Sequence, residues 1–348
     1  MFTTPAEALA ANPPPRARRA AIAVPDGTRP VDVGAALAAL RPYCDDAVAI
    51  VGLGLHRRMR ADELFPSPFL VVQHDPDDTI PTGAFDGIHG GVSRHVEVCD
   101  AIWTVGVVEM HQYAGFSGGH KGVTVGIGAR ATIDALHHRD RVTAPGVLVG
   151  QVEGNPFRAA IDTLGAMAGC TYALNTAGGR WLAGEPVRTF RQAAASLDCW
   201  WDLPRAYDAM VFRVPPRKAV NFYQASRAAT YVGLSARPPL SPGATLYLEA
   251  ACPEGLGEGS GEHAFAELAA RVAHPWTSLL SGEAPTGGGT QRAIMLALLL
   301  QKYRLVVTGC GAPEKLRTVG IEAHRERIEP EGALVVDDPF GKVPRLLG

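Results

Sequence analysis

Short apolar runs alternate with segments of helical periodicity along the first half of the chain. The apolar runs are "AAIAVPD", "AVAIVGLG", "FLVVQH" and "IWTVGVVE", and the helical patterns are "RPVDVGAALAAL", "ATIDALHH" and "NPFRAAIDTLGAMAG". This alternation is typical of parallel strands joined by crossover helices. Thr28 and Pro30 predict one helix start as N-cap and first-turn residue, and Asn155 with Pro156 predicts another.

The segment "CWWDLPRAYD" interrupts this pattern, and a second alternating series follows it. That series contains "AMVFRVPP", "ATLYLEAAC", "EHAFAELAARVA", "TQRAIMLALLLQKY" and "RLVVTG". We therefore predict two α/β domains with largely parallel sheets and an active site in the interdomain cleft. The expected boundary lies near residue 205. Residues 1–205 would form the catalytic, cofactor-binding domain, and residues 206–348 would form a domain that closes on the site.

The composition narrows the class of protein. The 348 residues are 47% hydrophobic and 20% charged, with a formal net charge of -2. Binding to nucleic acid or to an anionic membrane surface requires a concentrated positive footprint, so we expect neither partner. No apolar stretch has the length of a signal peptide or membrane span, which favours a cytoplasmic location. The six cysteines include no C-x-x-C pair, so they predict buried thiols. The oligomeric state is not indicated.

Common catalytic motifs do not fit. "GLGLHR" has Arg57 where a dinucleotide fingerprint needs its third glycine. "GFSGGHKG" resembles a phosphate-binding loop, but His120 precedes the lysine and Gly122 replaces the Ser or Thr that would hold magnesium. His95 and Cys99 lack a third ligand at useful spacing for zinc. These patterns therefore favour neither a nucleotide triphosphatase, nor an NAD dehydrogenase, nor a zinc hydrolase.

Several histidines follow predicted strands. His56 follows "AVAIVGLG", His111 follows "IWTVGVVE", and His74 ends "VVQH". Open α/β sheets bind ligands at the carboxyl ends of parallel strands, so each histidine is a candidate for a site. His137 ends a helical segment, where it could simply interact with the helix dipole. Position alone does not choose among these four residues.

A combination of motifs resembles one known family. The motifs are "VPDGTRP" (24–30), "GLGLHR" (52–57), "EMHQYAGFSGGHKGVTVGIGARATIDALHH" (109–138), "EGNP" (153–156) and "NFYQASR" (221–227). Their order and spacing resemble those of the nickel-pincer lactate racemases over most of residues 20–230. The most specific part is the block from 109 to 156, in which a histidine follows the lysine after 16 residues.

The resemblance implies a role for each matching position. Lys121 corresponds to the lysine that in the lactate racemases carries the pyridinium dithio-mononucleotide through a thioamide link, and His137 corresponds to the protein ligand of nickel. His56 and His111 correspond to paired acid/base histidines. The glycine-rich loop that would lie against the cofactor contains Gly115, Ser117, Gly118 and Gly119. The residues expected at the substrate are Asp26, Arg29, Tyr223, Gln224 and Arg227.

The chain departs from the family pattern on the expected substrate side. Arg227 stands where lactate racemase has lysine, and Ala219 replaces an acidic residue. The family's second-domain tryptophan has no clear match, and Gln291 and Arg292 occupy its neighbourhood. A guanidinium binds a carboxylate through two parallel hydrogen bonds, so Arg29 and Arg227 are the candidates for substrate binding. We expect a 2-hydroxy acid other than lactate, larger or carrying additional polar groups.

The implied reaction is racemisation or epimerisation of a 2-hydroxy acid through a 2-keto acid. Direct removal of the carbon-bound proton is difficult because the neighbouring carboxylate is anionic. Transfer of hydride to the cofactor, coupled to removal of the hydroxyl proton by a histidine, avoids that carbanion. Two alternatives remain: net hydride transfer from another alcohol, and a cofactor-binding homologue without activity. Separate synthesis proteins would have to supply the nickel-pincer nucleotide.

Overall fold

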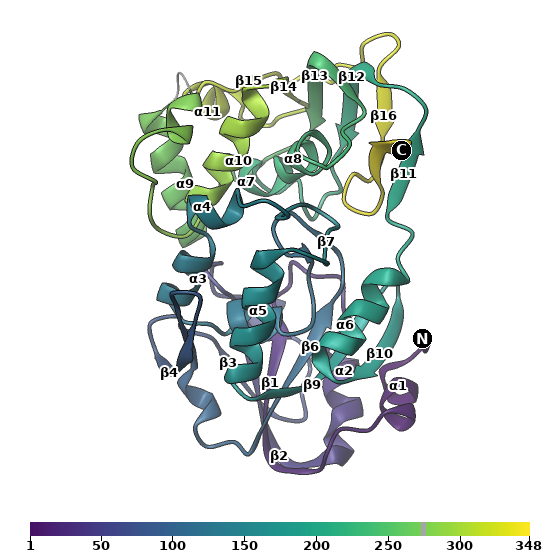
Figure 1. The fold of residues 1–348 in the computed structure, drawn as a ribbon, viewed down its shortest axis with the longest axis vertical. Coiled ribbons are helices and arrows are strands. Elements are labelled where there is room, and N and C mark those ends of the chain that lie inside the picture. Colours follow the sequence, from purple (N-terminus) through teal and green to yellow (C-terminus); the bar gives the residue numbers. More distant parts are fainter. Residues whose placement is uncertain (273–275) are drawn as a thin grey trace. The chain divides into compact units, whose positions relative to one another are not determined.

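The computed structural model describes residues 1–272 and 276–348, which divide into two compact units (Figure 1). The first unit comprises Met1–Glu109, Ala114–Leu136 and Gln151–Leu197. The second comprises Met110–Tyr113, His137–Gly150 and Asp198–Gly348. The second unit thus contains two short segments from the N-terminal half of the chain, and these segments carry His111 and His137.

The first unit is built on a mostly parallel six-stranded sheet. Its order is β10-β9-β6-β1-β2-β3, and only the β10–β9 pair is antiparallel. The strands are β1 (Ala17–Pro25), β2 (Cys44–Gly52), β3 (Leu70–Gln73), β6 (Ala101–Val107), β9 (Cys170–Ala177) and β10 (Arg180–Gly184). This confirms the predicted fold class. The chain builds outward from β1 in both directions, so the carboxyl ends of β1 and its neighbours form a topological switch point.

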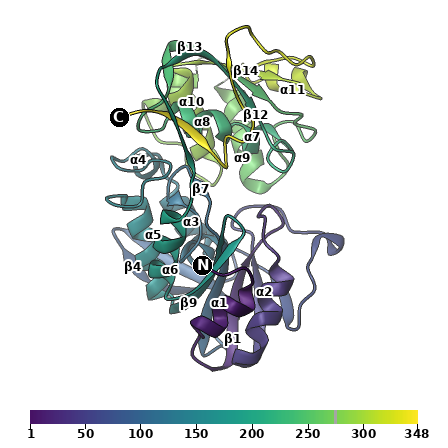
Figure 2. The same ribbon diagram turned by 90° about the vertical axis from the view of Figure 1, so that its right-hand side faces the viewer.

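Both faces of this sheet are covered. On β1, Ile22 and Val24 pack with α1 and α2, whereas Ala21 and Ala23 pack with the opposite layer. Figure 2 shows α2 and α5 on opposite sides of the strands. Covering elements are α1 (Pro5–Ala11), α2 (Val33–Leu40), β4 (Thr79–Phe85), β5 (Ile88–Ser93), η4 (Gly122–Gly126), α3 (Arg130–Leu136), α5 (Pro156–Met167) and α6 (Pro186–Ala195). Burial on both faces explains why the strands read as continuous apolar runs.

One of the two predicted helix starts is confirmed. Helix α5 begins at Pro156, and the Asn155 side chain accepts a hydrogen bond from the Arg158 N–H at 3.1 Å. The start at Thr28 and Pro30 is wrong, because α2 begins at Val33 with Asp32 as its N-cap. The Thr28 hydroxyl instead donates to Asp26 Oδ1 at 2.5 Å. Thr28 therefore stabilises the turn after β1 rather than a helix.

The second unit contains a parallel five-stranded sheet in the order β15-β14-β13-β12-β16. The strands are β12 (Tyr207–Arg213), β13 (Leu240–Glu249), β14 (Arg304–Thr308), β15 (Glu322–Ala323) and β16 (Leu334–Val336). A separate pair joins β11 (Trp200–Leu203) to β17 (Val343–Leu346). The helices are α4 (Arg139–Val142), α7 (Phe222–Ala225), α8 (Arg227–Gly233), α9 (Ser260–Arg271), α10 (Thr290–Leu300) and α11 (Pro313–Arg317).

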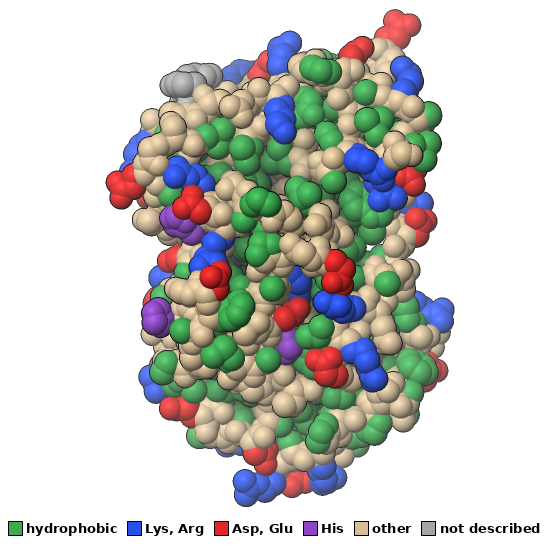
Figure 3. Space-filling view, viewed as in Figure 1, with side chains coloured by type: hydrophobic (Ala, Val, Ile, Leu, Met, Phe, Trp, Pro, Cys, Tyr) green, Lys and Arg blue, Asp and Glu red, His purple; other side chains and the backbone are tan. Residues whose placement is uncertain are grey.

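The burial of the cysteines and the distribution of surface charge agree with the predictions from composition. All six cysteines are free, and five of them are buried: Cys44, Cys170, Cys199, Cys252 and Cys310. Burial raises the pKa of the Cys170 thiol to about 12, so this group is unreactive at neutral pH. Figure 3 shows acidic and basic side chains interspersed on the visible face. Over residues 1–272 and 276–348, no helix has both the length and the apolar character needed to cross a membrane.

Candidate functional site

An Asp–His pair lies beyond the carboxyl ends of two adjacent strands of the first unit. Asp26 follows β1, and His56 lies in the segment after β2. The His56 Nδ1 is 2.7 Å from Asp26 Oδ2, while Asp26 Oδ1 accepts from the Thr28 hydroxyl and from the Thr28 N–H at 3.2 Å. Asp26 is 8% exposed, whereas the His56 side chain is 33% exposed. The strand order therefore places a buried carboxylate behind an accessible imidazole.

Electrostatics keep Asp26 ionised. Burial by itself raises the pKa of the Asp26 carboxyl, but the His56 ring, the Thr28 hydroxyl and the nearby Arg29 more than offset it. The net effect holds the Asp26 pKa well below its ordinary value. An ionised carboxylate can only accept a hydrogen bond, so a neutral His56 ring carries its proton on Nδ1, donates it to Asp26 Oδ2 in this bond, and has its lone pair on Nε2. This is the tautomer that a general base requires.

A second pair, Arg29 and Glu109, lies at the same edge of the sheet. The Arg29 Nη1 donates to Glu109 Oε2 at 3.0 Å, and both side chains are less than a third exposed. Arg29 was predicted to bind the substrate carboxylate, and that role stays a prediction. Glu109 was not predicted as a site residue, although it directly follows an apolar strand, as the predicted acid/base histidines do.

Three glycines of the predicted cofactor loop adopt left-handed backbone conformations. The φ angles of Gly115, Gly118 and Gly119 are 71°, 92° and 57°. A Cβ on Gly115 would lie 2.0 Å from the Gln151 carbonyl oxygen, and one on Gly118 would lie 2.6 Å from Val108 Cγ2. The fold itself therefore requires glycine at these positions. Their contact with a cofactor remains a prediction.

Ser117 ties this loop to the end of β6. Its hydroxyl donates to the Val107 carbonyl at 2.6 Å and accepts from the Glu109 N–H at 3.1 Å. The Ser117 N–H also donates to the Glu109 carbonyl at 2.8 Å. Ser117 is 4% exposed, and its hydroxyl stabilises the backbone conformation of the loop.

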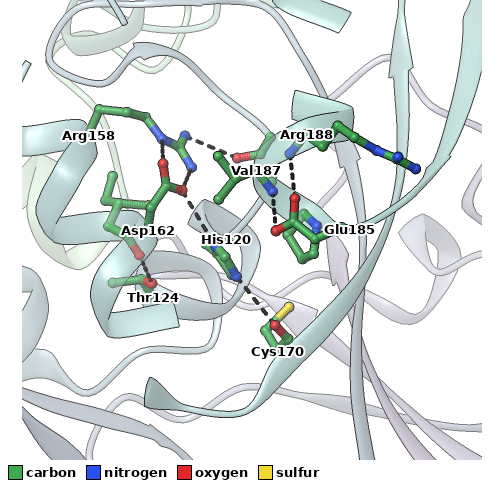
Figure 4. Close-up of polar contacts among 12 residues, drawn as sticks. His120, Thr124, Arg158, Asp162, Cys170, Glu185, Val187 and Arg188 are labelled. Atoms are coloured by element: carbon green, nitrogen blue, oxygen red, sulfur yellow. Dashed lines mark hydrogen bonds and ion pairs between the residues drawn. The ribbon is translucent and has the colours of Figure 1, made fainter. Parts of the chain in front are cut away.

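Behind the loop lies a buried ionic network, which Figure 4 shows around Asp162. The Arg158 guanidinium donates to both carboxylate oxygens of Asp162 and, at 3.2 Å, to the Gly118 carbonyl. The His120 Nδ1 is 3.3 Å from Asp162 Oδ1, and its Nε2 is 3.3 Å from the Cys170 carbonyl oxygen. His120 had no role predicted from the sequence. These two contacts hold its ring in place, and so fix the backbone directly before Lys121.

Lys121 immediately precedes an unusual helical turn. Residues Gly122–Gly126 form η4, a short π-helix, in which the Ile127 N–H donates to the Gly122 carbonyl at 3.1 Å. A Cβ on Gly122 would lie 2.3 Å from Thr104 Oγ1, so the turn packs tightly on β6. Such π-turns are rare and occur frequently at functional sites. Lys121 is partly exposed at the start of this turn.

In the second unit, Tyr113 contacts the predicted acid/base residue His111 and the predicted nickel ligand His137. Its ring centroid is 5.7 Å from that of His111 and 5.7 Å from that of His137, with edge-to-face geometry in both cases. The Tyr113 N–H donates to His111 Nδ1 at 3.3 Å, which leaves the proton of a neutral His111 on Nε2. Burial raises the pKa of Tyr113 to about 12. Sequence reasoning gave no role to Tyr113, and no spacing rule identifies it.

The predicted substrate residues of the second unit also lie close together. The Arg227 guanidinium is 5.7 Å from the centroid of the Tyr223 ring, and Gln291 Nε2 is 3.4 Å from the Tyr223 hydroxyl. Gln224 turns toward α9, where its Nε2 lies 3.4 Å from Glu262 Oε1. Arg227 and Arg292 both influence the Tyr113 hydroxyl electrostatically. This unit therefore groups His111, His137, Tyr223 and Arg227 around Tyr113.

The first unit groups the other candidates, with Asp26, Arg29 and His56 beyond the strand ends and Gly115, Ser117, Gly118, Gly119 and Lys121 in the loop after β6. Within the described ranges 1–272 and 276–348, no three His, Cys, Asp or Glu side chains are grouped to hold a metal ion. His74, the remaining strand-end histidine, is buried, and its Nε2 lies 2.8 Å from the Gly128 carbonyl oxygen.

Comparison with known families identifies the N-terminal part of the chain. Residues 8–147 match the family model of the lactate racemase N-terminal domain. These residues are therefore similar to that domain, and the match covers less than half of the chain. The matched region contains Asp26, His56, His111, Lys121 and His137, whereas the predicted substrate residues Tyr223, Gln224 and Arg227 lie outside the match.

Solved structures extend the likeness in fold to the whole chain. The lactate racemase apoprotein from Thermoanaerobacterium thermosaccharolyticum superposes with a TM-score of 0.80 and 17% sequence identity, covering 99% of this chain and 93% of that one. A protein from Thermotoga maritima gives a TM-score of 0.75 and 15% identity, covering 99% and 96%. No match is found among curated proteins. The lactate racemase fold is therefore shared well beyond the matched N-terminal domain.

Proposed function

We propose that this protein is a racemase or epimerase of a 2-hydroxy acid that uses a nickel-pincer nucleotide. The observation that carries the proposal is the hydrogen bonding of the two histidines. His56 is bonded through Nδ1 to the ionised Asp26, and His111 accepts the Tyr113 N–H at Nδ1. Neutral rings held in this way differ at Nε2, where His56 presents a lone pair that suits a base and His111 presents an N–H that can donate a hydrogen bond to the substrate oxygen.

The proton chemistry follows from these bonds. His56 Nε2 accepts the proton of the substrate hydroxyl, and the Asp26 carboxylate stabilises the imidazolium that forms. For the return step, the acid is a His111 imidazolium, which gives its Nε2 proton to the oxygen of the 2-keto acid, and the neutral ring that results is the base for the other enantiomer. Asp26 is thus a positioning residue for His56 in this scheme, in addition to its predicted place near the substrate.

The donor groups of the chain suit the proposed cofactor. His137 offers one imidazole, which fits a metal that arrives with its other ligands supplied by an organic group. Lys121 offers a primary amine at a partly exposed position on a rigid turn, which fits a covalent or ionic link to the nucleotide. When bound, the nickel-pincer nucleotide supplies the hydride acceptor. Synthesis proteins must deliver it, and we propose that this happens in the cytoplasm.

The carboxylate of the substrate is assigned to Arg227. Arg29 already donates to Glu109, whereas Arg227 forms no ion pair with a carboxylate anywhere in residues 1–272 and 276–348. A guanidinium holds a carboxylate in a defined orientation through paired hydrogen bonds. The neighbouring Tyr223 and Gln291 give this subsite additional polar groups.

The test is the intact mass and nickel content of the protein co-produced with the cofactor-synthesis proteins, with Lys121→Ala, His137→Ala and the exposed control Lys302→Ala. We expect a nucleotide-sized adduct and near-stoichiometric nickel in the wild type and in Lys302→Ala. Lys121→Ala should lose the adduct, and His137→Ala should lose nickel. Absence of both nickel and adduct in the wild type would refute the cofactor assignment.

Chiral analysis of the products then tests the reaction. Loaded enzyme should convert either enantiomer of a 2-hydroxy acid to the same mixture, without net formation of keto acid. Accumulation of a keto product would indicate net hydride transfer from an alcohol. Bound cofactor without turnover of any acid would indicate a cofactor-binding homologue.

A further inference from the structure

Two arginines of the second unit lie beside one tyrosine ring. Arg292 is the third residue of α10, and Arg227 is the first residue of α8. Their guanidinium carbons are 6.0 Å and 5.7 Å from the centroid of the Tyr223 ring. Arg292 is 2% exposed. Two positive charges therefore share a largely buried region.

Neither charge is neutralised by the described part of the chain. No ion pair joins Arg227 or Arg292 to a carboxylate within residues 1–272 and 276–348, and the Nε of each is buried without a hydrogen-bond partner. The Arg292 Nη1 donates to the Thr230 hydroxyl at 2.9 Å, and that hydroxyl donates to Gln112 Oε1 at 2.6 Å. These partners are uncharged, so they orient Arg292 without balancing its charge.

The surroundings make this arrangement costly. Burial lowers the pKa of Arg292, and the neighbouring Arg227 lowers it further, although Tyr113 opposes the change. Arg292 also lies in the first turn of an 11-residue helix, where the helix dipole disfavours a cation and no acidic residue is present. A buried charge of this kind is stabilised when an anion pairs with it.

The arginines also adjoin the residues proposed for catalysis. Both influence the Tyr113 hydroxyl electrostatically, and the Tyr113 ring contacts His111 and His137. An anion held by Arg227 and Arg292 would therefore lie close to the acid/base and metal-binding residues of the same unit.

We propose that Arg227 and Arg292 bind two anionic groups of one substrate, which is a 2-hydroxy acid with a second carboxylate. This inference rests on the proposed function for the hydroxyl-bearing centre. A single carboxylate would leave one positive charge uncompensated, whereas a dicarboxylate balances both guanidinium groups. The sequence predicted a substrate with additional polar groups, and this inference identifies them as a second carboxylate.

The experiment compares binding of matched acids to the purified full-length protein, both with and without cofactor loading. The probes are malate, 2-hydroxybutyrate, which has a methyl group in place of the second carboxylate, and succinate, which lacks the hydroxyl. Calorimetry gives the affinity, and thermal unfolding gives the stability. The variants are Arg292→Met, Arg292→Lys and the control Arg304→Met, whose side chain is 69% exposed.

We expect malate and succinate to bind at least about tenfold more tightly than 2-hydroxybutyrate, because each charged hydrogen-bonded contact is worth roughly this factor or more. Arg292→Met should abolish that preference, Arg292→Lys should retain part of it, and Arg304→Met should leave it unchanged. Without ligand, Arg292→Met should unfold at an equal or higher temperature than the wild type, because it removes an uncompensated buried charge. If the role of Arg292 were purely structural, Arg292→Met would instead lower the unfolding temperature of the protein.

Three results would overturn the inference. These are equal binding of malate and 2-hydroxybutyrate, no binding of either acid in both forms of the protein, or collapse of the fold in both Arg292 variants. Failure of the proposed function is distinguishable, because the dicarboxylates would then bind in an Arg292-dependent manner without racemisation. Racemisation of 2-hydroxybutyrate and malate with equal efficiency would retain the function and refute the second anion subsite.

Discussion

The His56 Nδ1 lies 2.7 Å from Asp26 Oδ2, although 30 positions separate the two residues in the chain. Strands β1 and β2 are adjacent and parallel, so the segments that follow them emerge at the same edge of the sheet. The buried carboxylate can therefore set the tautomer of the partly exposed ring.

The first prediction concerns the tautomer of His56. Asp26→Asn should lower kcat for the 2-hydroxy acid by about 10²- to 10⁴-fold, because an amide does not hold the proton on Nδ1 as a carboxylate does. KM should change little. Asp46→Asn, at a residue with a 61% exposed side chain on β2, is the matched control. Steady-state kinetics of the loaded enzyme make the comparison, and full activity in Asp26→Asn would show that Asp26 does not act on His56.

The second prediction concerns stability in acid. The pKa of Asp26 is lower in the folded protein than the ordinary value of about 3.9, so its ionised form stabilises the fold. That contribution is complete above about pH 5 and is lost as the pH falls below about 4 toward the folded-state pKa. The difference in unfolding free energy between the wild type and Asp26→Asn should therefore shrink between pH 5 and pH 3. The unfolding free energies are measured by urea titration at each pH. A constant difference between the wild type and Asp26→Asn from pH 5 to pH 3 would contradict this prediction.

The third prediction concerns the network behind the cofactor loop. Arg158→Met should destabilise the protein by roughly 3–5 kcal/mol, because it removes the main partner of the buried Asp162 carboxylate. Arg158→Met combined with Asp162→Leu should be less destabilising than the single substitution. The exposed Arg188 on α6 provides the control Arg188→Met. If the double variant in urea denaturation is the less stable one, the ionic interpretation of this network is wrong.

The fourth prediction separates two glycines with similar backbone conformations. Gly115 and Gly154 have φ angles of 71° and 69°, but only the Cβ of an alanine at 115 would collide with the chain, 2.0 Å from the Gln151 carbonyl oxygen. Gly154→Ala should cost about 1–2 kcal/mol from backbone strain alone. Gly115→Ala should cost clearly more, roughly 3 kcal/mol or above. If thermal unfolding showed equal losses of stability in the two variants, the loop at residue 115 would have to shift away from Gln151 at little cost.

Local sequence was sufficient for part of the molecule. Alternation of apolar strands with helical patterns predicted two parallel α/β sheets because strand pairing and helix periodicity depend on neighbouring residues. Asn155 and Pro156 predicted the start of α5 for the same reason, since capping involves only the next few residues. The helix start predicted at Thr28 was wrong because the Thr28 hydroxyl bonds to the nearby Asp26 carboxylate instead of capping a helix.

The amino-acid sequence by itself thus determined the fold class, the dispersed surface charge and the strand-end positions of His56 and His111. The tertiary structure decided which distant groups meet. It paired Arg29 with Glu109 across 80 positions, placed Tyr113 between His111 and His137, and brought Arg292 beside Arg227. Such contacts depend on strand order and helix packing, which no local pattern of residues encodes.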